Sequence, residues 1–153
     1  MRKTIFQCVG NTMLFTLFGL AFLFPASDVT KSEMGFSASL TIFPFLLLAF
    51  FIAYPIMYHI LAKKYQWGKK NNSELSYSDE REKIIVAEST KTAYTVLIGG
   101  VLFIIAVIGG INVFSLFTGM TISIYPISIT LLTLLLNIAM ISYCVKWCLE
   151  YKK

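Results

Sequence analysis

One long block of the sequence carries no charged residue: Thr92–Val145, TAYTVLIGGVLFIIAVIGGINVFSLFTGMTISIYPISITLLTLLLNIAMISYCV. A membrane-spanning helix needs about 20 mostly apolar residues. The block is therefore too long for one span, and it fits two spans that are joined by a short turn. It predicts transmembrane helices over about 92–111 and 121–145, with the turn between them on the outer side of the membrane.

Two shorter blocks without Asp, Glu, Lys or Arg precede this one, at Ile5–Phe24 and Met34–Ala62. Each is long enough for one span, and we expect these spans over about 5–24 and 38–61. The chain is 57% hydrophobic and 14% charged, whereas a soluble domain is about one quarter charged. The sequence therefore predicts an all-α membrane protein that forms one domain over 1–153, with four transmembrane helices.

The basic residues predict how the four helices are oriented. Of the 13 Lys and Arg residues, all but Lys31 lie before the first span, within 62–91, or after the last span. Lys and Arg stay on the cytoplasmic side of a membrane. We therefore expect two helix hairpins joined by a cytoplasmic loop at 62–91, both termini in the cytoplasm, and an outer loop at 25–37. The net charge of +5 then favours the lipid bilayer as partner, and not nucleic acid, because no basic domain is present.

A charged stretch, Ser78–Lys83 (SDEREK), comes shortly before the third span. Ser78 is a suitable N-cap, and acidic residues in the first turn match the positive end of the helix dipole. The third helix is therefore predicted to begin here and to extend about three turns into the cytoplasm. The stretch is either a solvated helix start or a surface that docks a partner. The candidate docking residues are Asp79, Glu80, Arg81 and Glu82.

Small and amide residues inside the spans predict where helices pack. Gly99, Ala106 and Gly110 fall near one face of the third helix, and small residues let helix backbones approach closely. This face is either a packing seam within the bundle or the contact of a homo-oligomer. The amides of Asn11 and Asn137 need partners in lipid, so we expect hydrogen bonds between helices, with substrate binding as the alternative.

Chemistry-bearing side chains are few. The predicted topology puts Cys8, His59, Cys144 and Cys148 near the inner membrane surface, but only the last two share a local helical spacing. A zinc site of three cysteines and one histidine is chemically feasible, whereas reduced thiols are ordinary in the cytoplasm. We expect no metal and no cofactor. Because no catalytic motif is present, we also expect no enzymatic activity.

The charged stretch also carries a resemblance. Asp79, Glu80 and Arg81, followed by Ile84 and then by the small and hydroxyl residues of 87–92, resemble a motif of small uncharacterised bacterial four-helix membrane proteins, a domain of unknown function. In those proteins an Asp-Glu-Arg motif stands before the third helix. The resemblance implies a bacterial membrane location more than it implies an activity.

The function predicted from the sequence follows from these exclusions. We expect a non-enzymatic, polytopic membrane protein that acts through a partner, as a regulator, a transporter accessory or an immunity protein. The partner is another membrane protein or a second copy of the chain. The alternative is a small oligomeric transporter or channel for a neutral solute.

Overall fold

The computed structural model describes residues 2–32, 35–65, 80–119 and 121–152. Four helices are present, as predicted, and each is long and apolar enough to cross a membrane. The elements are, in order, α1 (Arg2–Leu23), β1 (Ala26–Ser32), β2 (Gly35–Leu40), α2 (Ile42–Lys64), α3 (Glu80–Thr118) and α4 (Ile124–Lys152).

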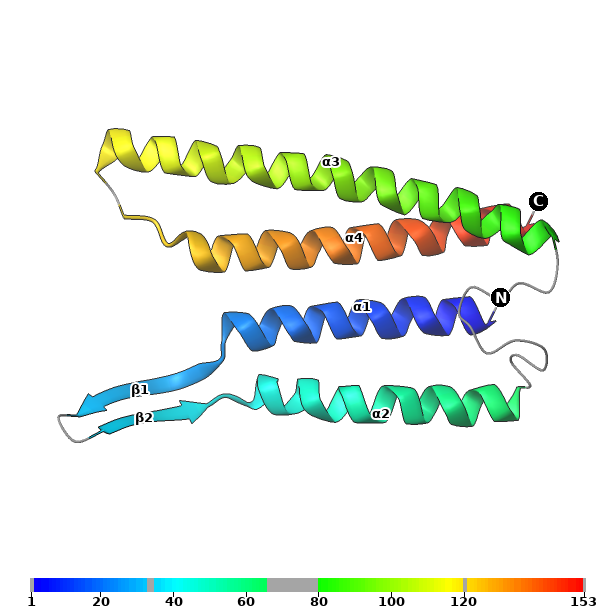
Figure 1. Cartoon of the computed structure of the whole chain (residues 1–153), viewed down its shortest axis with the longest axis horizontal. Helices are drawn as coiled ribbons and strands as arrows, with labels where there is room; N and C mark the ends of the chain where they lie inside the picture. The colour runs from blue at the N-terminus through cyan, green and yellow to red at the C-terminus, as the bar shows by residue number, and fades with distance from the viewer. Residues whose placement is uncertain (1, 33–34, 66–79, 120, 153) are drawn as a thin grey trace.

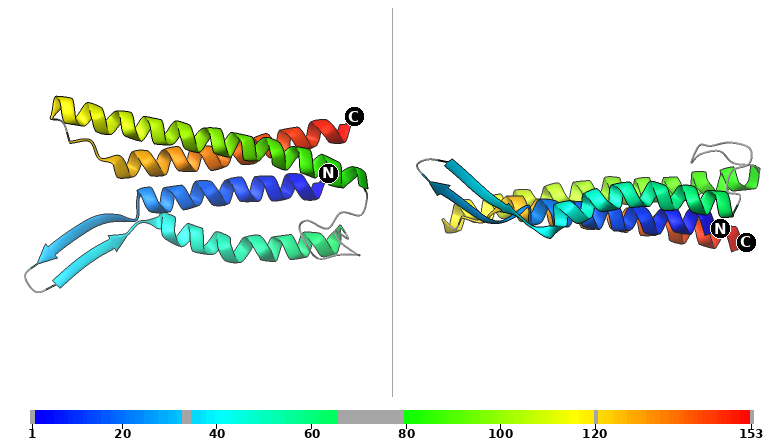
Figure 2. Two further views of the ribbon diagram at one scale, coloured as in Figure 1. Left: turned by 45° about the horizontal axis from the view of Figure 1, so that its top comes forward. Right: turned by 90° about the horizontal axis from the view of Figure 1, so that it is seen from below.

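The helices lie side by side in the order α3, α4, α1, α2 (Figure 1). Helix α3 packs on α4, α4 packs on α1, and α1 packs on α2, and two further views show the same row (Figure 2). The first and last helices of the chain therefore meet in the middle, and α2 and α3 form the two edges. Helix α1 begins and α4 ends at the same end of the row (Figure 1), which we call the terminal end.

Glycines stand at two of the contacts between these helices. A Cβ atom added to Gly10 would lie 2.6 Å from Cζ of Tyr54, where α1 meets α2. A Cβ atom on Gly19 would lie 2.9 Å from Cβ of Thr133, where α1 meets α4. Each glycine thus leaves room for a side chain of the neighbouring helix, and small residues are common where helices associate in lipid.

The predicted loop between α1 and α2, at 25–37, is folded as a β-hairpin, and its strands were not predicted. Strands β1 and β2 pair antiparallel, with Val29 opposite Ala38, and extend beyond the ends of α1 and α2 (Figure 1). Thr41 closes the base of the hairpin, since its backbone N–H donates to the carbonyl of Pro25 at 3.2 Å and its hydroxyl donates to the carbonyl of Phe24.

The predicted second span, 38–61, therefore began too early, because residues 38–40 belong to β2 and α2 begins at Ile42. The physical reason is a change of period in the sequence. Apolar residues alternate with serines up to Leu40, as in a strand, and become continuous only afterwards, as in a membrane helix.

Helix α3 is longer than the predicted span at both ends. Its 39 residues correspond to about 58 Å at 1.5 Å per residue. The predicted turn from residue 112 is helical as far as Thr118, where α3 ends, and the next residue, Gly119, has a φ of +67°. The N–H of Gly119 donates to the carbonyl of Ser115 at 2.9 Å, which is how a left-handed glycine closes a helix.

At the terminal end, α3 begins at Glu80, which precedes the charge-free block by about three turns, as predicted. Glu80 and Glu82 stand in its first turn, where the helix dipole favours acids. The predicted cap, Ser78, and the docking candidate Asp79 lie outside the described residues.

Candidate functional site

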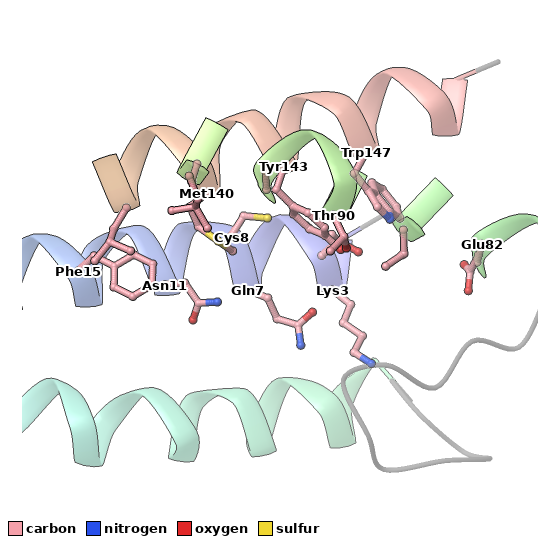
Figure 3. Close-up of a pocket in the computed structure, with 16 residues that line it drawn as sticks. Lys3, Gln7, Cys8, Asn11, Phe15, Glu82, Thr90, Met140, Tyr143 and Trp147 are labelled. Carbon is pink, nitrogen blue, oxygen red and sulfur yellow. The ribbon is translucent and has the colours of Figure 1, made fainter. Parts of the chain in front are cut away.

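A groove of about 430 Å³ opens at the terminal end, between α1, α3 and α4 (Figure 3). It exists because α1 and α3 both pack on α4 rather than on each other. Along α1 the lining runs from Lys3 to Phe15, about 18 Å of helix, and along α3 from Glu82 to Leu97, about 22 Å. The groove is therefore elongated and parallel to the helices.

The groove changes from polar to apolar along its length. Charged groups stand at the terminal end, amides and hydroxyls follow, and apolar side chains close the deep end. The charged, amide and hydroxyl residues of the lining are Lys3, Thr4, Gln7, Asn11, Glu82, Thr90 and Tyr143. The apolar side chains at the deep end are Phe15, Leu97 and Leu136.

One wall is a polar stripe on α1. Lys3, Gln7 and Asn11 recur at intervals of four residues, so they lie on one face of the helix, and their side chains follow one another along one side of α1 in Figure 3. Asn11, which we expected to bond to another helix, lines the groove and has no hydrogen-bond partner among the described residues. The spacing of this stripe is visible in the sequence, but nothing there indicates that α3 stands opposite.

The amide of Gln7 is unsatisfied. Its Nε2 atom is buried and has no hydrogen-bond partner among the described residues. A buried polar group without a partner costs about 1–3 kcal/mol. An acceptor atom on a bound molecule would remove this cost, so the groove has a chemical reason to be occupied.

The two charged residues of the lining come from different walls. Lys3 belongs to α1 and Glu82 to α3, and neither forms an ion pair with any described residue. Trp147 of α4 closes the wall near them, where it is 3% exposed and stacks on Tyr151 with ring centroids 4.9 Å apart. Beside an aromatic wall, the groove thus holds one cation and one anion that pair with no charged group in the described part of the chain.

The predicted docking residues divide between two surfaces. Glu82 is half-buried and lines the groove, whereas Glu80 and Arg81 are exposed on the first turn of α3. Next to them, Ile84 is 66% exposed. The next residue, Ile85, is buried.

The predicted packing residues behave differently from one another. Gly99, Ala106 and Gly110 are exposed, and a Cβ atom at either glycine would meet nothing within 4 Å. They therefore form no seam with the described parts of the other helices. The contact of α3 with α4 instead uses Gly100, where a Cβ atom would lie 3.0 Å from Cγ of Leu135. The other alternative, a contact with a second copy, remains a prediction.

Asn137 does bond to another helix. Its Nδ2 donates to Oγ1 of Thr16 at 3.2 Å, which links α4 to α1. The hydroxyl of Thr16 in turn donates to the carbonyl of Thr12 at 2.9 Å.

The cysteines converge only in part. Cys8 and Cys144 line a second hollow of about 290 Å³ between α1 and α4. His59 is exposed on α2. Within the described ranges, no three His, Cys, Asp or Glu residues are grouped so that they could hold a metal ion.

Comparison with known proteins yields no assignment. No family model, no curated protein and no solved structure matches the chain. The resemblance of Asp79, Glu80 and Arg81 to the motif of bacterial four-helix membrane proteins therefore remains a prediction.

Proposed function

We propose that this chain is a non-enzymatic, multi-pass protein of a bacterial cytoplasmic membrane, with both termini in the cytoplasm. It acts by docking a protein partner on the first turns of α3, as a regulator, a transporter accessory or an immunity protein. The distribution of basic residues supports the orientation. The four long apolar helices support the membrane location.

The observation that carries the proposal is the exposure of Ile84. The charge-free part of α3, Thr92–Thr118, is about 40 Å long, which exceeds the hydrocarbon thickness of about 30 Å. Ile84 stands eight residues before this part, about 12 Å farther out. It therefore lies outside the hydrocarbon core, where lipid chains do not cover it.

The surroundings of Ile84 match an interface. Exposed Glu80, Arg81, Lys83 and Glu88 flank it on the same turns, so an apolar centre is framed by both signs of charge. Protein interfaces share this plan, with a desolvated apolar core and a polar rim. We infer a partner that offers a small apolar pocket and complementary charges.

Site-directed photo-crosslinking in intact cells tests the proposal. A photoreactive residue at position 83 should give one discrete protein adduct, and the same residue at position 152, exposed at the same end of α4, should not. Ile84→Asp should abolish the adduct from position 83. Equal adducts from both positions, or an adduct that survives Ile84→Asp, would overturn the proposal.

A second function, an oligomeric transporter for a neutral solute, is favoured by one observation. The uncovered face of α3 with Gly99 and Gly110 offers the close approach that a second copy would use. Solute flux into vesicles that hold the purified protein would support this function if Gly99→Leu abolishes it. The control Ile98→Leu, at an exposed neighbouring position, should leave the flux unchanged. Flux equal to that of empty vesicles would exclude this function.

A further inference from the structure

We propose that the groove between α1, α3 and α4 binds the headgroup of a zwitterionic phospholipid, one that carries a phosphate and a primary ammonium. The inference rests on the groove alone and is independent of the docking surface around Ile84. It assigns contacts to Lys3, to Glu82 and to Nε2 of Gln7, which have no ion-pair or hydrogen-bond partner among the described residues.

The charges select the headgroup. Of the 16 residues that line the groove, only Lys3 and Glu82 carry a formal charge. A purely anionic head would bond to Lys3 but would be repelled by Glu82. A purely cationic head would bond to Glu82 but would be repelled by Lys3. A head with phosphate and ammonium satisfies both residues, and a primary ammonium also donates hydrogen bonds to the carboxylate.

The part of the groove around Gln7, deeper than Lys3 and Glu82, suits the glycerol backbone of a lipid. Nε2 of Gln7 is a buried donor without a partner, and an ester carbonyl offers the acceptor that it lacks. Gln7 stands one helical turn deeper than Lys3, about 6 Å along α1. The esters of a glycerolipid likewise lie just below the phosphate, on the side of the acyl chains.

The deep end suits an acyl chain. Phe15, Leu97 and Leu136 close the groove with apolar surface, and α1 and α3 do not pack on each other. A lipid can thus enter sideways from the bilayer. A volume of about 430 Å³ takes the head and the upper part of one chain, while the rest of the lipid stays in the membrane.

Native mass spectrometry of the purified full-length protein tests the proposal, with equal amounts of three lipids that share acyl chains. These lipids are phosphatidylethanolamine, phosphatidylcholine and phosphatidylglycerol. We expect one bound phosphatidylethanolamine, preferred about tenfold over the other two, because a charge-assisted hydrogen bond is lost in each of them. Equal retention of the three lipids would overturn the proposal.

Two variants locate the lipid. Glu82→Gln should remove the preference over phosphatidylglycerol, and Gln7→Leu should weaken the binding of phosphatidylethanolamine. Glu88→Gln changes an exposed acid of α3 outside the groove and should leave the preference unchanged. A preference that survives Glu82→Gln would refute the assigned contact. The preference is a ratio of two lipids within one spectrum, so a partial loss of folded protein does not alter it.

A soluble headgroup separates lipid from a free solute. Glycerophosphoethanolamine carries the same charges without acyl chains, and it should not displace the bound lipid at equal concentration. Displacement at equal concentration would show that the site takes the free solute, and would overturn the assignment of a lipid.

Discussion

The packing of α1 on α4 predicts opposite effects of the same substitution at two glycines. A Cβ atom at Gly19 would lie 2.6 Å from Cγ2 of Thr133 and 2.9 Å from its Cβ. Rotation about χ1 of Thr133 exchanges its Oγ1 and Cγ2 but leaves its Cβ in place. The rotamer cannot relieve the overlap, so Gly19→Ala must separate α1 from α4.

The magnitude follows from comparison with Gly99→Ala. Both substitutions gain helix propensity, about 0.5–1 kcal/mol for Gly to Ala. Only Gly19→Ala also overpacks a contact, which costs about 1–3 kcal/mol, since a Cβ atom at Gly99 meets nothing within 4 Å. The propensity gain cancels in the difference, so Gly99→Ala should be more stable than Gly19→Ala by about 1–3 kcal/mol.

The assay is equilibrium unfolding in mixed micelles by titration with a denaturing detergent. The chain has two tryptophans, so Trp67→Phe leaves the fluorescence of Trp147, which is buried in α4. Gly99→Ala should shift the midpoint upward and Gly19→Ala downward relative to this background. Equal shifts in the same direction would refute the contact between Gly19 and Thr133.

The same titration checks three further predictions. Ser89 is fully buried and its hydroxyl donates only within α3, so Ser89→Ala should be nearly neutral and Ser89→Leu should cost about 1–3 kcal/mol; equal effects would contradict this. Glu150→Gln should cost at most about 0.5 kcal/mol, because the partly exposed pair with Lys146 has the weaker helical orientation; a larger loss would show that the pair is more important. Asn137→Leu should cost about 0.6 kcal/mol, the typical value for a hydrogen bond between membrane helices, and a gain in stability would show that this bond contributes nothing.

Charge placement made the helices predictable. The three uncharged blocks locate all four helices, because a charge inside hydrocarbon is costly. The early start of α3 at Glu80 could also be predicted, since acidic residues follow a serine, a residue type that favours the N-cap position. The sequence was less informative between the first two helices. We missed the β-hairpin there, although apolar residues and serines alternate visibly up to Leu40.

The packing faces could not be predicted, and the reason is physical. In water an apolar stripe marks the buried face of a helix, but in a membrane the face toward lipid is apolar as well. Phe103 is 64% exposed and Leu135 is 6% exposed, and their residue types do not tell them apart. For the same reason Gly99 was predicted to pack, whereas its neighbour Gly100 does so.

The groove depends on the order of the helices, which no local pattern contains. Gln7 and Asn11 share a face by their spacing, but Glu82 joins them only because α3 and α1 flank α4. Glu82 was predicted as a docking residue from its position in the charged stretch. The structure instead places it in the lining of the groove, to which α1 contributes Lys3.

The most direct test of the account is the membrane topology. In a cysteine-free background, single cysteines replace exposed residues at both ends of two helices, Leu40 and Lys64 for α2, and Thr121 and Lys152 for α4. A membrane-impermeant maleimide added to intact spheroplasts should label positions 40 and 121 at once, and positions 64 and 152 only after permeabilisation. Labelling of both ends of one helix from the outside, or the reverse pattern, would contradict a four-span protein with its termini and its charged α3 surface in the cytoplasm.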